Sequence, residues 1–231
     1  MRQGSWPRTI FTALLLTVFL LTASVTVPIL WRGFYYSQIE ALNLTARSGF
    51  SPTVIREAFD QVMDFLVWGQ PYGTGQLRSS AEGRAHFADC QFLFRVDFIV
   101  AAVTGVILLF LLIRALNDPS FRRKFAFSVP LLSLCILGGV LLILGVWAFV
   151  DFTSLFTVFH RLAFPGKTNW IFEASTDQII LILPEDFWVR AAALVAGLAL
   201  GVAALLSALH GLLHLKWKPK SVYDELTGMD E

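Results

Sequence analysis

The sequence predicts a membrane protein, mainly α-helical, with four transmembrane helices and a small mixed α/β extracytoplasmic cap built from the two outer loops. Hydrophobic residues make up 56% of the 231 positions and charged residues only 15%. The mean hydropathy of +0.65 lies outside the range of soluble proteins. Because the apolar residues gather in long runs, we expect the whole chain, 1–231, to form a single integral membrane domain.

Four apolar segments are long enough to span a bilayer. A hydrocarbon core roughly 30 Å thick needs about 20 apolar residues in a helix. The segments are 9–31, 96–113, 125–150 and 191–215. The first is read as a retained helix, because its apolar run is longer than that of a typical signal peptide and no convincing cleavage site follows.

The basic residues predict the orientation of these spans. Lys and Arg near the ends of membrane helices favour the cytoplasmic side. They concentrate at the amino terminus, between the second and third spans, and in the tail, at Arg2, Arg8, Arg114, Arg122, Arg123, Lys124, Lys216, Lys218 and Lys220. We therefore expect both termini and the tail 216–231 to be cytoplasmic, with loops 32–95 and 151–186 outside.

The two outer loops carry local signals of both helix and strand. In the first loop, Ser51 and Pro52 are typical of a helix start, and an apolar stripe follows in SPTVIREAFDQVMDFLVW. The segment AEGRAHFADCQFLFR alternates loosely between polar and apolar residues, which favours a strand. In the second loop, DFTSLFTVFHRLAF has helical spacing, PGKTNW turns the chain, and QIILIL is typical of a short buried strand.

Several partner and cofactor classes are excluded or not expected. The net charge is +1 and the basic residues form no patch, so a nucleic-acid partner is excluded. The two cysteines, Cys90 and Cys135, are read as free thiols. The chain contains no G-x-S-x-G elbow, H-E-x-x-H motif, phosphate-binding glycine loop or C-x-x-C pair. Neither a metal ion nor a cofactor is expected.

The candidate chemistry lies in two histidines, one in each outer loop. His86 and His160 have side chains that exchange protons near neutral pH. Each alone is typical of a surface or structural residue, but the topology places both at the same face of the membrane. Glu82, Asp89 and Asp177 are carboxylates able to orient an imidazole, although surface solvation is the better explanation for any one of them.

Two loop motifs together resemble a known family. The segment FHRLAFPGKTNWIF, followed by DQIILILPEDFW, resembles the second outer loop of the bacterial Lit family, the lipoprotein intramolecular transacylases. The segment SAEGRAHFADC is similar to the first-loop element of that family, with Cys90 at a position where the family pattern has an aliphatic residue. Four spans with both termini inside also match, so the resemblance covers nearly the whole chain.

The resemblance implies an acyltransferase of the bacterial cell membrane. Its substrates would be diacylglyceryl-modified lipoproteins held in membrane lipid, and it would move the sn-2 acyl chain to the α-amino group of the same cysteine. The functional histidines of the family match His86 and His160, in acid/base and oxyanion roles. Supporting or oxyanion candidates are Gly166, Asn169, Trp170, Glu82 and Asp89.

Two other functions remain open from the residues alone. One is a metal-dependent membrane hydrolase that uses His86, His160 and a carboxylate as ligands. The other is a non-enzymatic four-helix membrane subunit whose outer cap binds a partner.

Overall fold

The structure, a computed structural model, is mainly helical and describes residues 4–122 and 124–216, with side chains as far as residue 213. Four of its helices are long and apolar enough to cross a membrane, which confirms the four predicted spans. They are α1 (Trp6–Leu30), α5 (Ala81–Asn117), α7 (Val129–Val150) and α9 (Glu185–Lys216). The predicted tail beyond residue 216 lies outside the described residues.

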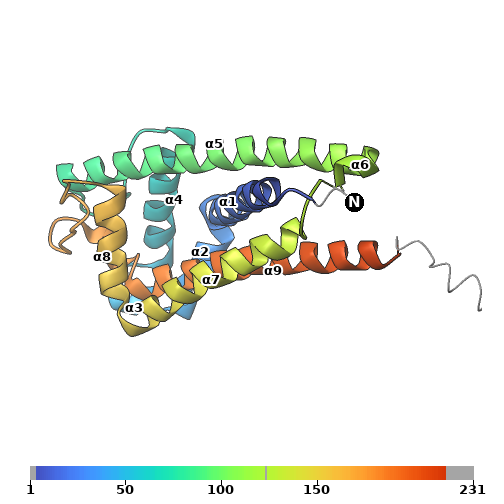
Figure 1. Ribbon diagram of the computed structural model, residues 1–231. Coiled ribbons are helices and arrows are strands. Elements are labelled where there is room, and N and C mark those ends of the chain that lie inside the picture. The colour runs from blue at the N-terminus through green and yellow to red at the C-terminus, as the bar shows by residue number, and fades with distance from the viewer. Residues whose placement is uncertain (1–3, 123, 217–231) are drawn as a thin grey trace, which may run out of the picture.

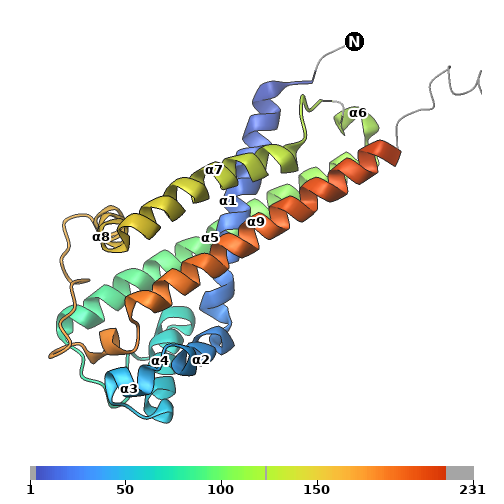
Figure 2. The same ribbon diagram turned by 90° about the horizontal axis from the view of Figure 1, so that it is seen from below.

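The two predicted outer loops meet at one end of the helix bundle. Figure 2 shows α2 (Arg32–Ala41), α3 (Leu44–Ser48), α4 (Pro52–Trp68) and α8 (Phe152–Ala163) at this end. The first described residues, the short helix α6 (Pro119–Arg122) and the end of α9 lie at the opposite end. The chain therefore brings segments about 80 residues apart in sequence to the same end.

Helix α1 lies at the centre of the bundle and packs against α5, α7 and α9 (Figure 1). Its hydroxyl groups join it to its neighbours: Thr17 Oγ1 lies 3.0 Å from Ser133 Oγ on α7, and Thr26 Oγ1 donates to Asp97 Oδ2 at 2.9 Å on α5. In lipid, where apolar burial gives little drive for association, such bonds and close packing hold helices together.

The predicted strand in the first loop is wrong, because its residues form the start of α5. Ser80 caps this helix by accepting a hydrogen bond from Gly83 N at 2.9 Å. The next buried residues, His86 and Phe87, follow Gly83 at helical spacing. At 1.5 Å per residue the 37 residues of α5 extend about 55 Å, well beyond a bilayer core. Residues 81–95 therefore stand outside the span 96–113.

The second predicted strand is also wrong, and no strand occurs among the described residues. QIILIL instead contains a 3₁₀-helix, η1 (Gln178–Leu181), and Ile179 within it and Ile182 just after it are both buried. Just before η1, Asp177 accepts a hydrogen bond from Ser80 N at 2.7 Å. The segment is thus fixed to the start of α5 by side-chain bonds and not by a sheet.

Gly83 permits this close approach. A Cβ atom at position 83 would lie 2.2 Å from Asp177 Oδ1, so the Asp177 side chain, which binds Ser80 N, would have to move. Glycine at this position therefore favours the contact between the two loops.

Helix α4 follows its predicted start and apolar stripe. Ser51 caps it through Val54 N at 3.4 Å. Tyr35 of α2 stacks on Phe59 with ring centroids 3.6 Å apart and donates its hydroxyl to Ile182 O at 2.9 Å. The buried face comprises Ile55, Ala58, Phe59, Val62, Met63 and Leu66.

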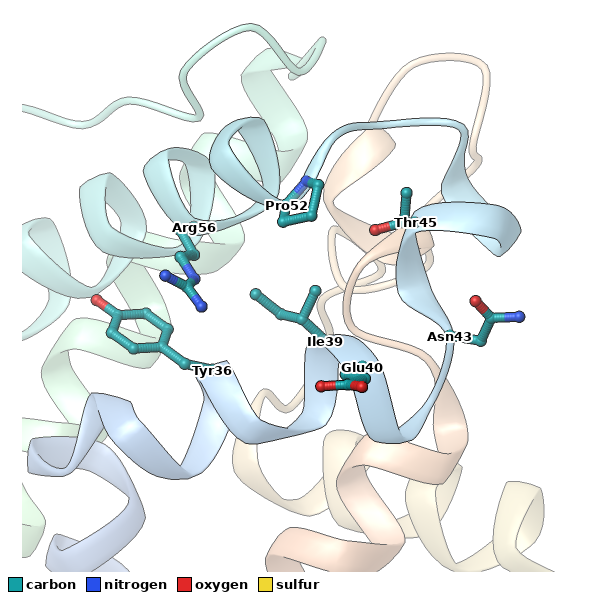
Figure 3. A pocket seen from close by; sticks show the side chains of 7 residues that line it. All are labelled: Tyr36, Ile39, Glu40, Asn43, Thr45, Pro52 and Arg56. Atoms are coloured by element: carbon teal, nitrogen blue, oxygen red, sulfur yellow. The ribbon is translucent and has the colours of Figure 1, made fainter.

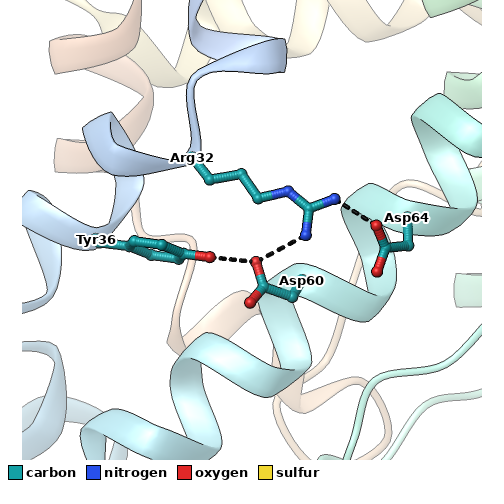
Figure 4. Close-up of polar contacts among 4 residues, drawn as sticks. All are labelled: Arg32, Tyr36, Asp60 and Asp64. Atoms are coloured by element: carbon teal, nitrogen blue, oxygen red, sulfur yellow. Dashed lines mark hydrogen bonds and ion pairs between the residues drawn. The ribbon is translucent and has the colours of Figure 1, made fainter.

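An ion-pair cluster joins the start of α2 to α4 (Figure 4). Arg32 pairs with Asp60 at 3.1 Å and with Asp64, and Tyr36 donates to Asp60 at 2.6 Å. These side chains are partly exposed, so the cluster adds only modestly to the stability of the protein.

Candidate active site

His86 of α5 and His160 of α8 lie together. Their ring centroids are 5.8 Å apart, with 33° between the ring planes. Each side chain is only 7% exposed. Two histidines that are 74 positions apart therefore share one buried site at the end of the bundle where loops 32–95 and 151–186 meet.

Aromatic rings surround the histidine pair. Phe164 contacts both imidazoles, with centroid distances of 5.0 Å to His86 and 5.8 Å to His160. Phe156 and Trp170 pack on His160 at 4.0 and 4.8 Å. Such an apolar enclosure excludes water and strengthens every electrostatic interaction inside it.

The tautomer of His160 follows from its partner. Its Nδ1 lies 2.8 Å from the carbonyl oxygen of Phe156, one turn earlier in α8. A carbonyl oxygen only accepts, so Nδ1 carries the proton and donates it to this bond. Burial lowers the pKa of His160, while the bond to Phe156 raises it in part. At neutral pH the ring is neutral, and Nε2 holds a lone pair that can accept a proton.

His86 is also neutral at pH 7. Burial, followed by the nearby His160, lowers the pKa of His86 to about 4, despite the opposing effect of Asp89. Its Nε2 lies 3.4 Å from Cys90 Sγ, and its buried Nδ1 has no hydrogen-bond partner in the described part of the chain.

Cys90 bears on which nitrogen of His86 carries the proton. Burial raises the pKa of the Cys90 thiol to about 12, so the sulfur keeps its hydrogen. When this thiol donates to His86 Nε2, the single proton of the neutral ring sits on Nδ1. The free nitrogen of His86 is then a hydrogen-bond donor.

The turn after α8 begins at Phe164, the residue that contacts both imidazoles. Lys167 N donates to Phe164 O at 3.1 Å, with Pro165 at the second turn position and Gly166 at φ +75° in the third. This is the geometry of a type II turn, which requires glycine at the third position. Gly166 itself is exposed.

Asp89 ties this turn to α5. Lys167 Nζ pairs with Asp89 Oδ1, and Asn169 Nδ2 donates to Asp89 Oδ2 at 3.0 Å. The hydrogen bonds from Lys167 and Asn169 lower the pKa of Asp89. The Trp170 indole N–H donates to Lys167 O at 3.0 Å, so this predicted oxyanion donor is already engaged.

The structure separates the predicted supporting residues. Trp170 packs on His160, Asp89 acts on the pKa of His86 and Asn169 is bound to Asp89, whereas Glu82 is exposed in the first turn of α5. Sequence reasoning missed the contact of Cys90 with His86 and the packing of Phe172 on His86 at 5.4 Å. Assigning residues 81–95 to a helix would have revealed the first contact, because the two residues are four positions apart.

A separate pocket of about 350 Å³ opens between α2, α3 and α4 (Figure 3). Arg56 lies over the Tyr36 ring there, at 5.1 Å from the ring centre. None of the residues around the histidine pair lines this pocket, which comprises Tyr36, Ile39, Glu40, Asn43, Thr45, Pro52 and Arg56. The chemistry described above therefore lies elsewhere.

The metal-dependent alternative lacks a ligand set. Within residues 4–122 and 124–216, no three His, Cys, Asp or Glu side chains are grouped so that they could hold a metal ion. Asp89, the carboxylate that acts on the pKa of His86, is engaged by Lys167 and Asn169.

Comparison with known proteins identifies the family. The family model described as lipoprotein intramolecular transacylase Lit matches residues 10–188. No curated protein matches the chain. Among solved structures, the membrane integral lipoprotein intramolecular transacylase Lit from Bacillus cereus superposes with a TM-score of 0.72 at 22% identity, covering 90% of this chain and 94% of that one. A variant of that protein with a histidine replaced by arginine gives a TM-score of 0.65 at 22% identity, covering 90% and 91%. The chain belongs to the Lit family of lipoprotein intramolecular transacylases, and it is an integral membrane acyltransferase.

Proposed function

We propose that the protein moves the sn-2 acyl chain of a diacylglyceryl-modified lipoprotein from the glyceryl oxygen to the α-amino group of the same N-terminal cysteine. The product is an N-acylated lyso-form lipoprotein. The observation that carries this proposal is the meeting of His86 and His160 in one buried aromatic site, in a chain of the Lit family.

His160 acts as the general base. An α-amino group has a reference pKa of about 7.7 to 8.0, so at pH 7 much of it is protonated and cannot attack an ester. Nε2 of His160 accepts this proton, since Nδ1–H is already bound to Phe156 O. The imidazolium then gives this proton to the departing glyceryl oxygen, and the second proton that the nitrogen loses as it becomes an amide is released to solvent. The C–N bond forms, the C–O bond breaks, and His160 ends neutral.

His86 stabilises the oxyanion that develops on the ester carbonyl. Its Nδ1–H is a buried donor without a partner in the described chain, and the ring stays neutral at pH 7. One well-placed donor to an oxyanion contributes about 100- to 1000-fold in rate. The aromatic rings around it exclude the water that would otherwise compete for this bond.

No enzyme nucleophile is needed. Ester and amine belong to one molecule, so folding the lipid headgroup until they meet supplies most of the catalysis, roughly 7 to 11 kcal/mol. Cys90 lies nearest to His86, but its raised pKa of about 12 keeps it a thiol and a poor nucleophile.

The proposal includes a location in the bacterial cell membrane, with residues 1–231 forming one integral membrane domain. The distribution of basic residues supports cytoplasmic termini, with α8 and residues 81–95 on the extracytoplasmic side. Lipoproteins carry their lipidated cysteine at the outer leaflet, so this orientation brings substrate and histidines to the same face.

The experiment is mass spectrometry of a lipoprotein from a host whose lipoproteins are otherwise diacylated. Acyl migration leaves the mass unchanged, so tandem fragmentation of the N-terminal lipopeptide must locate the acyl chain. Expression of the protein should yield fragments with an N-acyl group. Fragments with both acyl chains still on glycerol would overturn the proposal. Activity that disappears with a chelator and returns with a divalent metal would favour the hydrolase class instead.

A further inference from the structure

We propose that Asn169 Oδ1 accepts a hydrogen bond from the α-amino group of the substrate, and that Asp89 positions Asn169 for this task. The inference rests on the proposed acyl transfer and assigns the part of the site that holds the nucleophile. It makes Asn169 a hydrogen-bond acceptor for the amine, whereas a residue that binds the oxyanion would be a hydrogen-bond donor.

The orientation of the Asn169 amide is fixed by its partner. The carboxylate of Asp89, paired with Lys167, only accepts hydrogen bonds, so the nitrogen of the Asn169 amide must face it. The 3.0 Å bond from Nδ2 to Asp89 Oδ2 therefore directs Oδ1 away from Asp89. Exchanging the two amide atoms would place two acceptors in contact.

The amide oxygen has no partner of its own. Among the residues that the structure describes, two buried side-chain polar atoms lack a hydrogen-bond partner, Asn169 Oδ1 and His86 Nδ1. Native proteins leave few such atoms, because each costs the free energy of desolvation. Here both belong to the same site, which points to groups of a bound substrate as their partners.

One of the two unpartnered atoms is a hydrogen-bond donor and the other an acceptor, and the reaction requires one of each. Acyl transfer to an amine develops an oxyanion, which needs a donor, and requires an aligned amine, whose N–H groups need acceptors. His86 Nδ1–H suits the first and Asn169 Oδ1 suits the second. A protonated amine can donate one hydrogen to His160 Nε2 and another to Asn169 Oδ1, which fixes the direction of its lone pair after deprotonation.

The position of Asn169 agrees with this role. It precedes Trp170, whose ring packs on His160 at 4.8 Å. It is bound to Asp89, which lies three residues after His86 on α5. Asn169 is thus held between the segments that carry the base and the oxyanion donor.

The test compares two non-reactive ligands, ether-linked dialkylglyceryl lipopeptides that have either the free α-amino group or a hydrogen in its place. Wild type should bind the amine ligand about 3- to 10-fold more tightly, the range for one hydrogen bond. Asn169→Leu, which keeps the size but removes both the acceptor and the donor to Asp89, should abolish this ratio and lower the rate of N-acylation at saturating substrate about 10- to 100-fold. Thr168→Ala, at an exposed site in the same turn, should change neither.

A paired exchange tests the positioning role of Asp89. Asn169→Asp alone sets two carboxylates against each other and should lower the rate. Combining it with Asp89→Asn restores an amide donor facing a carboxylate and still leaves an oxygen free, so the double variant should recover most of the lost rate and the binding ratio. A double variant no better than Asn169→Asp would show that Asp89 does not position the acceptor.

The outcomes separate this inference from the proposed function. Damage to the fold lowers binding of both ligands and leaves their ratio unchanged, so an unchanged ratio in Asn169→Leu would overturn the acceptor role. Wild type that produces no N-acyl lipopeptide would overturn the proposed function itself and, with it, the inference.

Discussion

Replacing His160 by Asn removes the proposed general base and keeps the hydrogen bond of this side chain to Phe156 O. The amide of an asparagine at this position can still donate to Phe156 O, which His160 Nδ1 does at 2.8 Å, but it has nothing in place of Nε2. The helix bond is kept while the proton acceptor is lost. General-base catalysis contributes about 100- to 10,000-fold, equivalent to roughly 2.7 to 5.4 kcal/mol of transition-state stabilisation. The rate at saturating substrate should fall by that factor.

The assay follows N-acylation of a synthetic diacylglyceryl lipopeptide by purified protein, with tandem mass spectrometry separating the N-acyl product from its isomer. His210→Asn is the matched control, because His210 lies in the last two turns of α9, whose end is opposite to α8 in Figure 2, and its rate should equal that of wild type. Thermal unfolding of each variant checks the fold. A folded His160→Asn protein within about threefold of the wild-type rate would refute the assignment of His160 as the base.

Three further predictions concern pH, Cys90 and Arg32. Because the pKa of His86 is about 4 in the folded chain and near 6.5 when unfolded, the unfolded chain binds more protons between these values. The melting temperature should therefore fall as the pH is lowered from about 6.5 towards 4, and less steeply in His86→Asn; equal slopes would contradict the pKa assignment. Cys90→Ala removes the donor to Nε2 of His86 and should lower the rate about tenfold. Cys90→Ser keeps a donor and should retain more activity. ¹⁵N NMR of His86 should report the change of tautomer in Cys90→Ala. Arg32→Ala removes the partner of two partly exposed aspartates and should cost about 1 kcal/mol of unfolding free energy, measured by denaturation, with the rate of the folded protein unchanged.

Local sequence was a good guide wherever one segment alone decides its structure. The four spans follow from runs of apolar residues, because a helix satisfies its backbone hydrogen bonds internally in lipid. Helix α4 follows from Ser51, Pro52 and its apolar stripe. The turn at Gly166 follows from the Pro-Gly pair, since the positive φ there is accessible to glycine.

The same local reasoning failed where a segment depends on a distant partner. The alternation in residues 81–95 suggested a strand, but the described part of the chain offers no second strand to pair with it, and the cap at Ser80 starts a helix that continues into the span. QIILIL reads as a strand by composition, yet Asp177 binds Ser80 N and holds the segment in a different shape. A strand needs a neighbour, and composition does not say whether one exists.

The sequence by itself determined that the chain has four membrane spans and that loops 32–95 and 151–186 each carry one histidine. Only the tertiary structure decided which atoms of those residues are available. Phe156 O engages Nδ1 of His160, Cys90 lies against Nε2 of His86, and Asp89 takes the nitrogen of Asn169. The physical reason is that a hydrogen bond depends on distances of about 3 Å, and only folding brings Asp89 to Asn169, 80 residues further along the chain.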